Sequence, residues 1–169
     1  QSQFRAAEIS ALLDTGYFIE RAERLYQYPH FICDTGGSIC EWVNAEDPAD
    51  PVLSALAAHT LMVWIEGSQD HTAELIRRFD RAPKPMAYMP EFLARTWAEY
   101  RALNNQSDAE VDPDAFIRWT YAQALAHRQP RYAAIARHWG VTVQADDVAR
   151  VHSPQDFDAL IAQAIAAKS

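Results

Sequence analysis

The sequence lacks every complete motif that cradles a nucleotide phosphate. Glycine is scarce, with five residues in the 169, and none of the five precedes a lysine. The phosphate-binding patterns G-x-x-x-x-G-K-[ST] and G-x-G-x-x-G are absent, and so is G-x-S-x-G, the pattern around a nucleophilic serine. Because the amides and lysine of such a loop supply most contacts to a triphosphate, we expect this chain alone to bind ATP weakly or not at all.

Long apolar runs and an excess of positive charge are also missing. No apolar run approaches the roughly 18 residues of a membrane-spanning helix. The first residues, Gln1–Arg5, have neither the basic start nor the apolar stretch of a signal peptide. The formal charge of −8 argues against a general nucleic-acid binder, since attraction to phosphate needs a positive field. We therefore expect a cytoplasmic protein without membrane or nucleic-acid partners and, because it starts without Met, a processed or truncated product.

Cysteine is too rare for a disulfide framework. Cys33 and Cys40 lie in one short segment without CxxC spacing, and the chain has no second pair. The pattern therefore argues against a structural zinc site and against a disulfide scaffold. Two reduced, half-buried thiols are the expectation.

Apolar periodicity predicts a helix-rich α/β fold. Short apolar runs indicate three buried strands, at Phe31–Cys33, Leu61–Ile65 and Val141–Val143. Helical spacing indicates helices over Phe4–Leu13, Phe18–Tyr26, Asp70–Phe79, Glu91–Leu103, Asp112–His127, Arg131–Trp139, with Gly140 closing the last of these, and a final helix that ends at Ala167. The Pro-rich segment Ala82–Pro90 should be irregular. Strands that alternate with helices predict a small parallel sheet flanked by helices, in a single domain or domain fragment over residues 1–169.

The most specific segment is Asp34-Thr35-Gly36-Gly37-Ser38, directly after the first predicted strand. Ligands of open α/β sheets lie beyond the carboxyl ends of the strands, so Asp34 is placed to hold Mg²⁺ or one of its waters. The hydroxyls of Thr35 and Ser38 would complete the shell, and the two glycines would let backbone N–H groups approach a ligand. An equally good alternative is a capped turn, in which Asp34 accepts amide hydrogen bonds and Ser38 begins a short helix.

Two other protein classes use similar letters. Aspartic proteases place D-T-G after an apolar strand, but they are all-β and pair two such loops, whereas this helix-rich chain has one. Sugar-kinase-type ATPases use D-x-G-G-T between two strands of a hairpin, and Ile39–Val43 would then be the return strand. That second alternative stays open.

A second candidate site is a group of cations in an acidic protein, namely Arg77, Arg78, Arg81 and Lys84. The group follows a strand–helix unit and precedes the Pro-rich segment, so it fits a lid whose guanidinium groups bind phosphate oxygens. The alternative is a solvated helix end, where cations are favoured by the helix dipole.

The three arginines are not expected to be equivalent. If Leu75, Ile76 and Phe79 mark the buried side of the helix, steps of about 100° per residue place Arg78 at the border of that side and Arg77 opposite it. We therefore expect Arg78 to be the residue that contributes most to phosphate chemistry.

A third cation-rich segment, His127–Tyr132, is followed by Arg137 and His138. It is either a further phosphate-binding group or ordinary surface, with the surface reading favoured.

Three runs of this sequence resemble segments of bacterial proteins identified only as ATPases, at Tyr28–Glu41, Arg77–Pro85 and Ala126–Tyr132. Those proteins are similar to P-loop kinases, with an N-terminal phosphate loop followed by a region similar to this whole chain. The resemblance implies the C-terminal part of a P-loop ATPase or kinase-like protein that uses Mg²⁺ and ATP. It places Asp34 near the metal at a Walker-B-like strand end and the Arg77–Lys84 group in a lid.

The resemblance also implies that this chain needs a partner segment to bind the phosphates. The strand, loop and helix that hold the phosphates are missing here, so the expected partner is an N-terminal P-loop segment, or a second copy through self-association, and the phosphoryl acceptor is undefined. The competing hypothesis is a non-enzymatic α/β interaction or regulatory module, in which the Asp34 turn is only structural.

Overall fold

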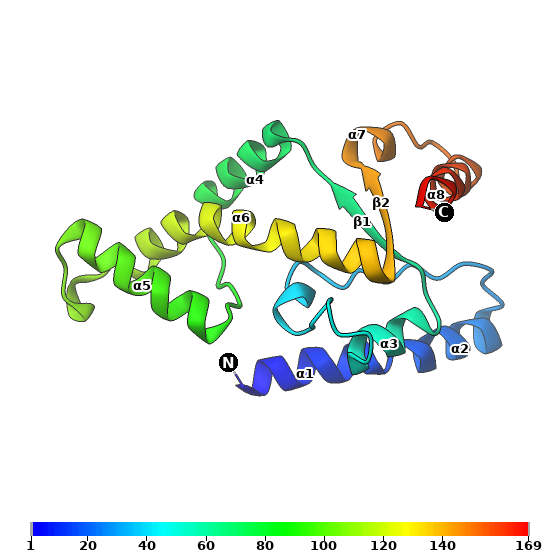
Figure 1. The fold of residues 1–169 in the computed structure, drawn as a ribbon, viewed down its shortest axis with the longest axis horizontal. Coiled ribbons are helices and arrows are strands. Elements are labelled where there is room, and N and C mark those ends of the chain that lie inside the picture. Colours follow the sequence, from blue (N-terminus) through cyan, green and yellow to red (C-terminus); the bar gives the residue numbers. More distant parts are fainter. Residues whose placement is uncertain (1, 169) are drawn as a thin grey trace. The chain divides into compact units, whose positions relative to one another are not determined.

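The computed structural model describes residues 2–168, which form helices and one small sheet (Figure 1). In chain order the elements are α1 (Ser2–Leu13), α2 (Thr15–Tyr26), the 3-10 helix η1 (Ile39–Glu41), α3 (Pro51–Ala57), β1 (Met62–Glu66), α4 (Gln69–Arg81), α5 (Pro90–Asn104), the 3-10 helix η2 (Asp108–Glu110), α6 (Pro113–Trp139), β2 (Gly140–Gln144), α7 (Ala145–Val148) and α8 (Pro154–Lys168). The helix-rich α/β class is confirmed. The chain divides into unit 1, which runs up to Glu66 and resumes at Arg131, and unit 2, Gly67–Pro130.

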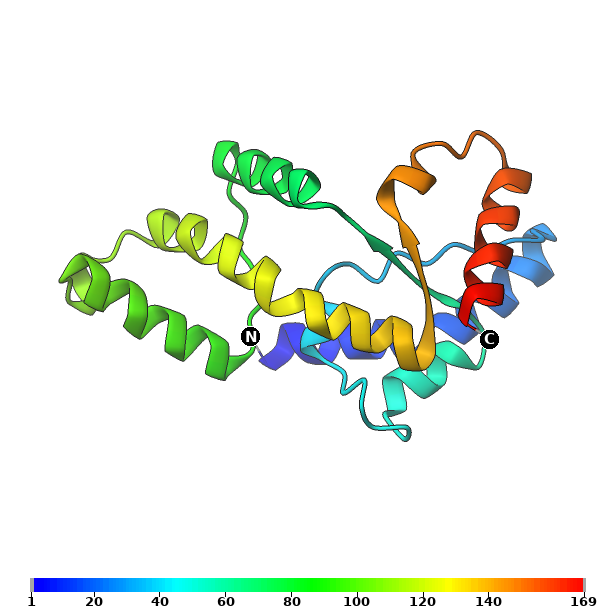
Figure 2. The same cartoon turned by 45° about the horizontal axis from the view of Figure 1, so that its top comes forward.

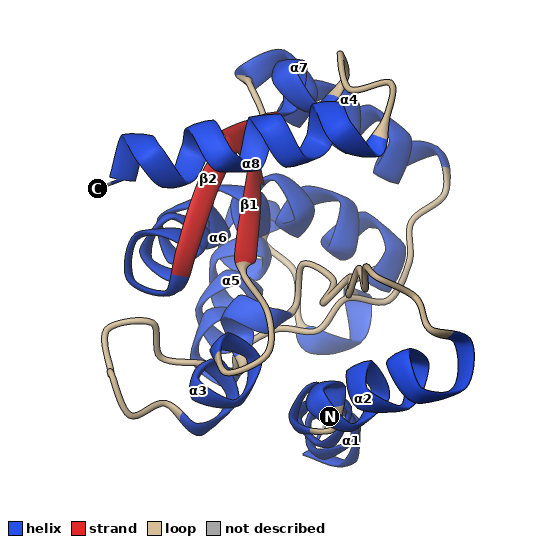
Figure 3. Cartoon of the chain, turned by 90° about the vertical axis from the view of Figure 1, so that its right-hand side faces the viewer, coloured by secondary structure: helices blue, strands red, loops and turns tan. Residues whose placement is uncertain are grey.

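The sheet consists of β1 and β2, which pair in parallel and lie side by side in Figure 3. Met62 is opposite Gly140 and Glu66 is opposite Gln144. Two of the predicted strands are thus confirmed, with ends that differ by about one residue. A parallel pair needs a long crossover, and here α4, α5 and α6 form it.

The strand predicted at residues 31–33 is wrong. This segment has no regular secondary structure, and the side chain of Ile32 is 86% exposed. A strand needs a neighbour for its backbone N–H and C=O groups. Within residues 2–168, β1 and β2 are paired only with each other, so the apolar run does not join the sheet.

Helix α6 is continuous through Pro130, so the prediction of two helices separated at residues 128–130 is wrong. An internal proline removes a backbone hydrogen bond and costs about 3 kcal/mol. Buried residues on both sides of it offset that cost, with Ala124 in the core of unit 2 and Ile135 in the core of unit 1. Figure 2 shows α6 running directly into β2 without a loop.

Helix α6 ends at Trp139, directly before Gly140, as expected, and Gly140 is also the first residue of β2. A Cβ atom at this position would lie 2.0 Å from the carbonyl oxygen of Met62 in the neighbouring strand. The close backbone approach therefore requires glycine here. Lys168 closes the junction by donating to the carbonyl of Gly140 at 2.6 Å.

Unit 1 has its own apolar core, formed by α1, η1, α3 and the C-terminal part of α6. Its buried members are Leu12, Ile39, Cys40, Val52, Leu53, Leu56 and Ile135. Helix α3 was not predicted, although Asp50 caps it by accepting from the amides of Val52 and Leu53, with proline at its first position. Helix α8 contacts β2, whose Val141 and Val143 are buried, while no residue of β1 is fully buried.

Unit 2 packs through aromatic rings on α4, α5 and the N-terminal part of α6. Phe79 of α4 stacks on Tyr121 of α6 with ring centroids 3.9 Å apart. Burial raises the pKa of the Tyr121 hydroxyl, and the nearby charge of Arg128 partly opposes this effect. Residues 83–89 form no regular element, which confirms the prediction for the Pro-rich segment.

The two cysteines and the hydrophobicity of the described helices can be compared with the predictions from composition. Both cysteines are free thiols, but Cys40 is buried and Cys33 is exposed, so neither is half-buried as expected. Among the described residues, no helix combines the length and hydrophobicity needed to cross a membrane.

Candidate functional site

The candidate site in unit 1 is the turn at residues 34–38. The amide of Gly36 donates to Oδ1 of Asp34 at 2.8 Å, and Gly36 has φ +67°, which glycine adopts without strain. This bond confirms the part of the capped-turn hypothesis in which Asp34 accepts an amide hydrogen bond. Asp34 is exposed, so its carboxylate remains accessible to a cation from solvent.

Helix α1 anchors one end of the turn. The hydroxyl of Ser38 donates to Oε2 of Glu8 at 3.0 Å, and the indole N–H of Trp42 donates to the same oxygen. The guanidinium of Arg5 lies 5.7 Å from the centre of the Trp42 ring. Ser38 precedes η1 without capping it, because its side chain is directed to Glu8.

Helix α6 anchors the middle of the turn. The carbonyl of Gly37 accepts from the hydroxyl of Tyr132 at 2.6 Å and from Sγ of Cys40 at 3.5 Å. Arg131 donates to the carbonyl of Cys40 at 3.0 Å. Arg131 and Tyr132 belong to the cation-rich segment predicted either to bind phosphate or to be ordinary surface, and here both bind backbone carbonyls of unit 1.

The same helix holds the chain beyond the turn. The indole N–H of Trp139 donates to the carbonyl of Ala45 at 3.1 Å. Glu46 pairs with Arg137 at 2.9 Å and lies 3.1 Å from Nε2 of His138. Side-chain contacts from the last turns of α6 therefore hold the segment 37–46.

The predicted cation group lies in unit 2, at the C-terminal end of α4. Arg77 and Arg78 both pair with Glu74, at 2.6 Å and 2.8 Å. The hydrogen bond from Arg78 is the main reason that the pKa of Glu74 is lowered, and the charge of Arg77 adds to it. Arg81 and Lys84 are exposed, Lys84 in the irregular segment after the helix.

The prediction that Arg78 lies at the border of the buried side is wrong. The side chains of Arg77 and Arg78 are 62% and 70% exposed, and Leu75 is 44% exposed rather than inward. The inward residues are Ile76 and Phe79, so both arginines lie well away from the buried side of α4.

The two groups of predicted residues fall in different units. Asp34, Thr35, Gly36, Gly37 and Ser38 are brought together by one turn, and Arg77, Arg78 and Arg81 by one helix end. Glu8 was missed by the sequence analysis, because no local pattern links a glutamate on the first helix to a serine thirty positions later.

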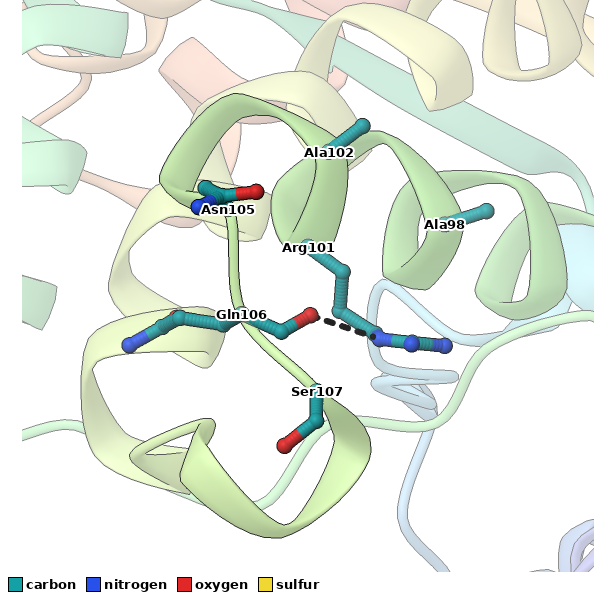
Figure 4. Close-up of a pocket in the computed structure, with 6 residues that line it drawn as sticks. All are labelled: Ala98, Arg101, Ala102, Asn105, Gln106 and Ser107. Atoms are coloured by element: carbon teal, nitrogen blue, oxygen red, sulfur yellow. Dashed lines mark hydrogen bonds between the residues drawn. The ribbon is translucent and has the colours of Figure 1, made fainter.

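An open pocket in unit 2 contains none of the predicted residues (Figure 4). It lies at the C-terminal end of α5 and is lined by Ala98, Arg101, Ala102, Asn105, Gln106 and Ser107. Arg101 is already occupied there, since its Nε donates to the carbonyl of Gln106 and it pairs with Asp108 at 2.8 Å. The pocket therefore offers no free cation for an anionic ligand.

No group of three His, Cys, Asp or Glu side chains is placed to hold a metal ion among residues 2–168. Magnesium is usually bound by one or two carboxylates, with waters and substrate phosphates as the other ligands. A single exposed carboxylate such as Asp34, beside two hydroxyl residues, fits that mode of binding and not a cage made entirely of protein.

Comparison with known proteins adds no relative. No protein-family model, no curated protein and no solved structure matches this chain.

Proposed function

We propose that the chain is the C-terminal part of an ATP-dependent P-loop-type protein, either an ATPase or a small-molecule or nucleotide kinase. The observation that carries this proposal is the exposed carboxylate of Asp34 on a turn that two helices hold. A fixed, accessible carboxylate is what a Mg²⁺ ion shared with a triphosphate needs from its protein.

In this proposal the turn binds the Mg²⁺ ion of Mg-ATP. Asp34 holds Mg²⁺ directly or through water, and Thr35 and Ser38 offer hydroxyl oxygens nearby. The hydroxyl of Ser38 donates its hydrogen bond to Glu8, so the lone pairs of the Ser38 oxygen remain available as acceptors. When bound, Mg²⁺ would neutralise charge on the phosphates. The amide of Gly36 already donates to Oδ1 of Asp34, so it would act on a ligand only through that carboxylate.

The cations at the end of α4 are proposed as a separate phosphate-binding group within unit 2. Arg77, Arg78 and Arg81, with Lys84, would neutralise the charge of a phosphate group bound there. The pairs of Arg77 and Arg78 with Glu74 are exposed, and exposed ion pairs contribute only about 0–1 kcal/mol. A phosphate group, with more charge and more acceptor oxygens, can therefore displace Glu74.

The test of the metal role is Asp34→Asn in the protein encoded by the complete reading frame. Asparagine keeps an oxygen for the amide of Gly36 but removes the charge, so ATP turnover should fall by about a hundredfold or more while the thermal midpoint stays constant. Asp47→Asn is a matched control, because Asp47 is also exposed and also accepts an amide two residues on, from Ala49 at 2.9 Å. Near-normal turnover of Asp34→Asn would remove the metal role.

Two further measurements bear on the proposal. Titration of Mg-ATP into the chain of residues 1–169 should show weak or no binding, and a micromolar dissociation constant would place the site elsewhere. Single alanine variants of Arg77, Arg78 and Arg81 should lower turnover, and Arg78 is no longer expected to differ from Arg77, because both side chains are exposed and both pair with Glu74. Three equal and small effects would show that the group is a solvated helix end.

One observation favours the second candidate, a non-enzymatic interaction module. Large apolar side chains are exposed in one stretch of unit 1, namely Leu13, Tyr17, Phe18, Leu25, Tyr26, Tyr28, Phe31 and Ile32. Exposed apolar patches mark interaction surfaces. If a second copy of the chain covers this stretch, sedimentation analysis should show a dimer that Ile32→Ser dissociates, and a monomer at all concentrations would contradict it.

A further inference from the structure

We infer that Tyr132 is a positioning residue for the Asp34 site, an inference that rests on the proposed function. The hydroxyl of Tyr132 holds the carbonyl of Gly37 at 2.6 Å. By fixing this carbonyl, α6 sets the conformation in which the turn presents Asp34 at the surface.

The turn needs an anchor from outside because its own sequence is permissive. Gly36 and Gly37 are adjacent, and glycine has the greatest backbone freedom of any residue. The bond from Gly36 to Asp34 spans two positions and fixes only the first half of the turn. The hydroxyl of Tyr132 reaches Gly37 from 95 positions later in the chain, so it ties the second half to the fold of unit 1.

The remaining contacts do not replace this bond. Sγ of Cys40 reaches the same carbonyl at 3.5 Å, but a thiol is a weak donor. Glu8 accepts from the side-chain hydroxyl of Ser38 and so does not hold the peptide between Gly37 and Ser38, to which the carbonyl of Gly37 belongs. Tyr132 is therefore the strong donor to Gly37.

The tyrosine is itself held in place. Its ring lies beside Trp64 of β1, with centroids 6.4 Å apart, and it packs against the core of unit 1. Its neighbour Arg131 binds the carbonyl of Cys40 at 3.0 Å. The donor thus sits on a rigid helix beside the sheet, as a residue that positions a reactive group must.

Loss of the bond from Tyr132 should affect kcat and KM differently. A metal ion stabilises charge that develops in the transition state, so a misplaced Asp34 lowers kcat. Binding of ATP draws most of its affinity from a phosphate loop outside this turn, so KM for ATP should change little. A merely structural residue would lower the stability and leave kcat per folded molecule unchanged.

The experiment is Tyr132→Phe in the protein encoded by the complete reading frame, with ATP turnover, amide hydrogen exchange and thermal midpoint measured together. Loss of one hydrogen bond should speed exchange in residues 36–38 by about fivefold. We expect kcat to fall by about tenfold at constant KM. Tyr121→Phe is the control, because Tyr121 stacks on Phe79 in unit 2, and it should change neither quantity.

The outcomes separate this inference from the proposed function. If Asp34→Asn is inactive while Tyr132→Phe keeps its full kcat, the positioning role is overturned and the proposed function stands. If Asp34→Asn is active, or the wild-type protein has no ATP turnover, the proposed function falls and the positioning role falls with it. Faster exchange alone, with normal turnover, would make Tyr132 a structural anchor only.

Discussion

The turn at residues 34–38 and the cationic end of α4 both carry polar side chains on the surface, but different contacts hold them. The turn is bound by Glu8, 30 positions before Ser38, and by Tyr132, 95 positions after Gly37. The arginines of α4 are bound by Glu74, three and four positions away on the same helix. One region therefore takes its shape from the whole of unit 1, and the other from a single helix.

This difference has a physical consequence. Long-range contacts exist only after unit 1 has folded, so the geometry of the Asp34 turn and the stability of unit 1 depend on each other. Contacts within one helix form with the helix and contribute a few tenths of a kcal/mol each. The fold of unit 1 therefore fixes the geometry of the turn, whereas the arginines at the end of α4 can exchange partners at little cost in free energy.

The largest expected effect comes from breaking the backbone contact that closes unit 1. In Gly140→Ala the new Cβ would lie 2.0 Å from the Met62 carbonyl oxygen, so the strands must separate, and we expect a loss of about 3 kcal/mol in the free energy of unfolding. Gly67→Ala is the control, because its Cβ would meet Cβ of His71 at 3.1 Å and cost less than about 1 kcal/mol. Urea unfolding measures both, and equal midpoints would contradict this account.

A smaller effect compares two glutamates directly. Glu8→Ala removes a charged acceptor of two hydrogen bonds and should lower the free energy of unfolding by about 2 kcal/mol. Glu74→Ala removes two exposed ion pairs and should cost about 0.5 kcal/mol or less. Thermal unfolding of both variants tests the comparison, which fails if Glu74→Ala is the more damaging change.

The smallest effect concerns pH and unit 2. Hydrogen bonds from the amide and then the hydroxyl of Ser107 lower the pKa of Glu110 from its ordinary value of 4.5. A lowered pKa in the folded state stabilises the protein above the unfolded value, and this contribution is lost as the pH falls from about 4.5 through the folded value. Glu110→Gln should lack this part of the acid dependence, as thermal midpoints at a series of acidic pH values would show. An unchanged profile would mean that the capping contact adds nothing.

Local features were predictable from the sequence. Most helices, the strands at β1 and β2 and the irregular Pro-rich segment follow from apolar spacing and from proline, which act over a few residues. The bond between Asp34 and Gly36 belongs to the same class, since an Asp two positions before a glycine closes its own turn.

The anchors of the site were not predictable in this way. No sequence pattern near Glu8 indicates that it accepts hydrogen bonds from Ser38 and Trp42. The sequence around Arg131 and Tyr132 is likewise the same whether these side chains bind a phosphate or a backbone carbonyl. The choice is made by packing that joins distant segments, which single-sequence patterns do not contain.

The failures at residues 31–33 and at Pro130 have the same origin. An apolar run becomes a strand only if another strand pairs with it, and a proline ends a helix only if no packing on both sides outweighs its cost. Among the described residues no strand pairs with the segment of Ile32, and the buried residues Ala124 and Ile135 provide the packing that outweighs the cost of Pro130.

The direct passage from α6 into β2 restricts how this chain can change in length. Trp139 is the last residue of the helix and Gly140 the first of the strand, so no loop absorbs an inserted residue. Because side chains alternate along a strand, one extra residue at this point would turn Val141 and Val143 away from the core or shift the helix by about 100°. Insertions and deletions should therefore be selected against at positions 139–140.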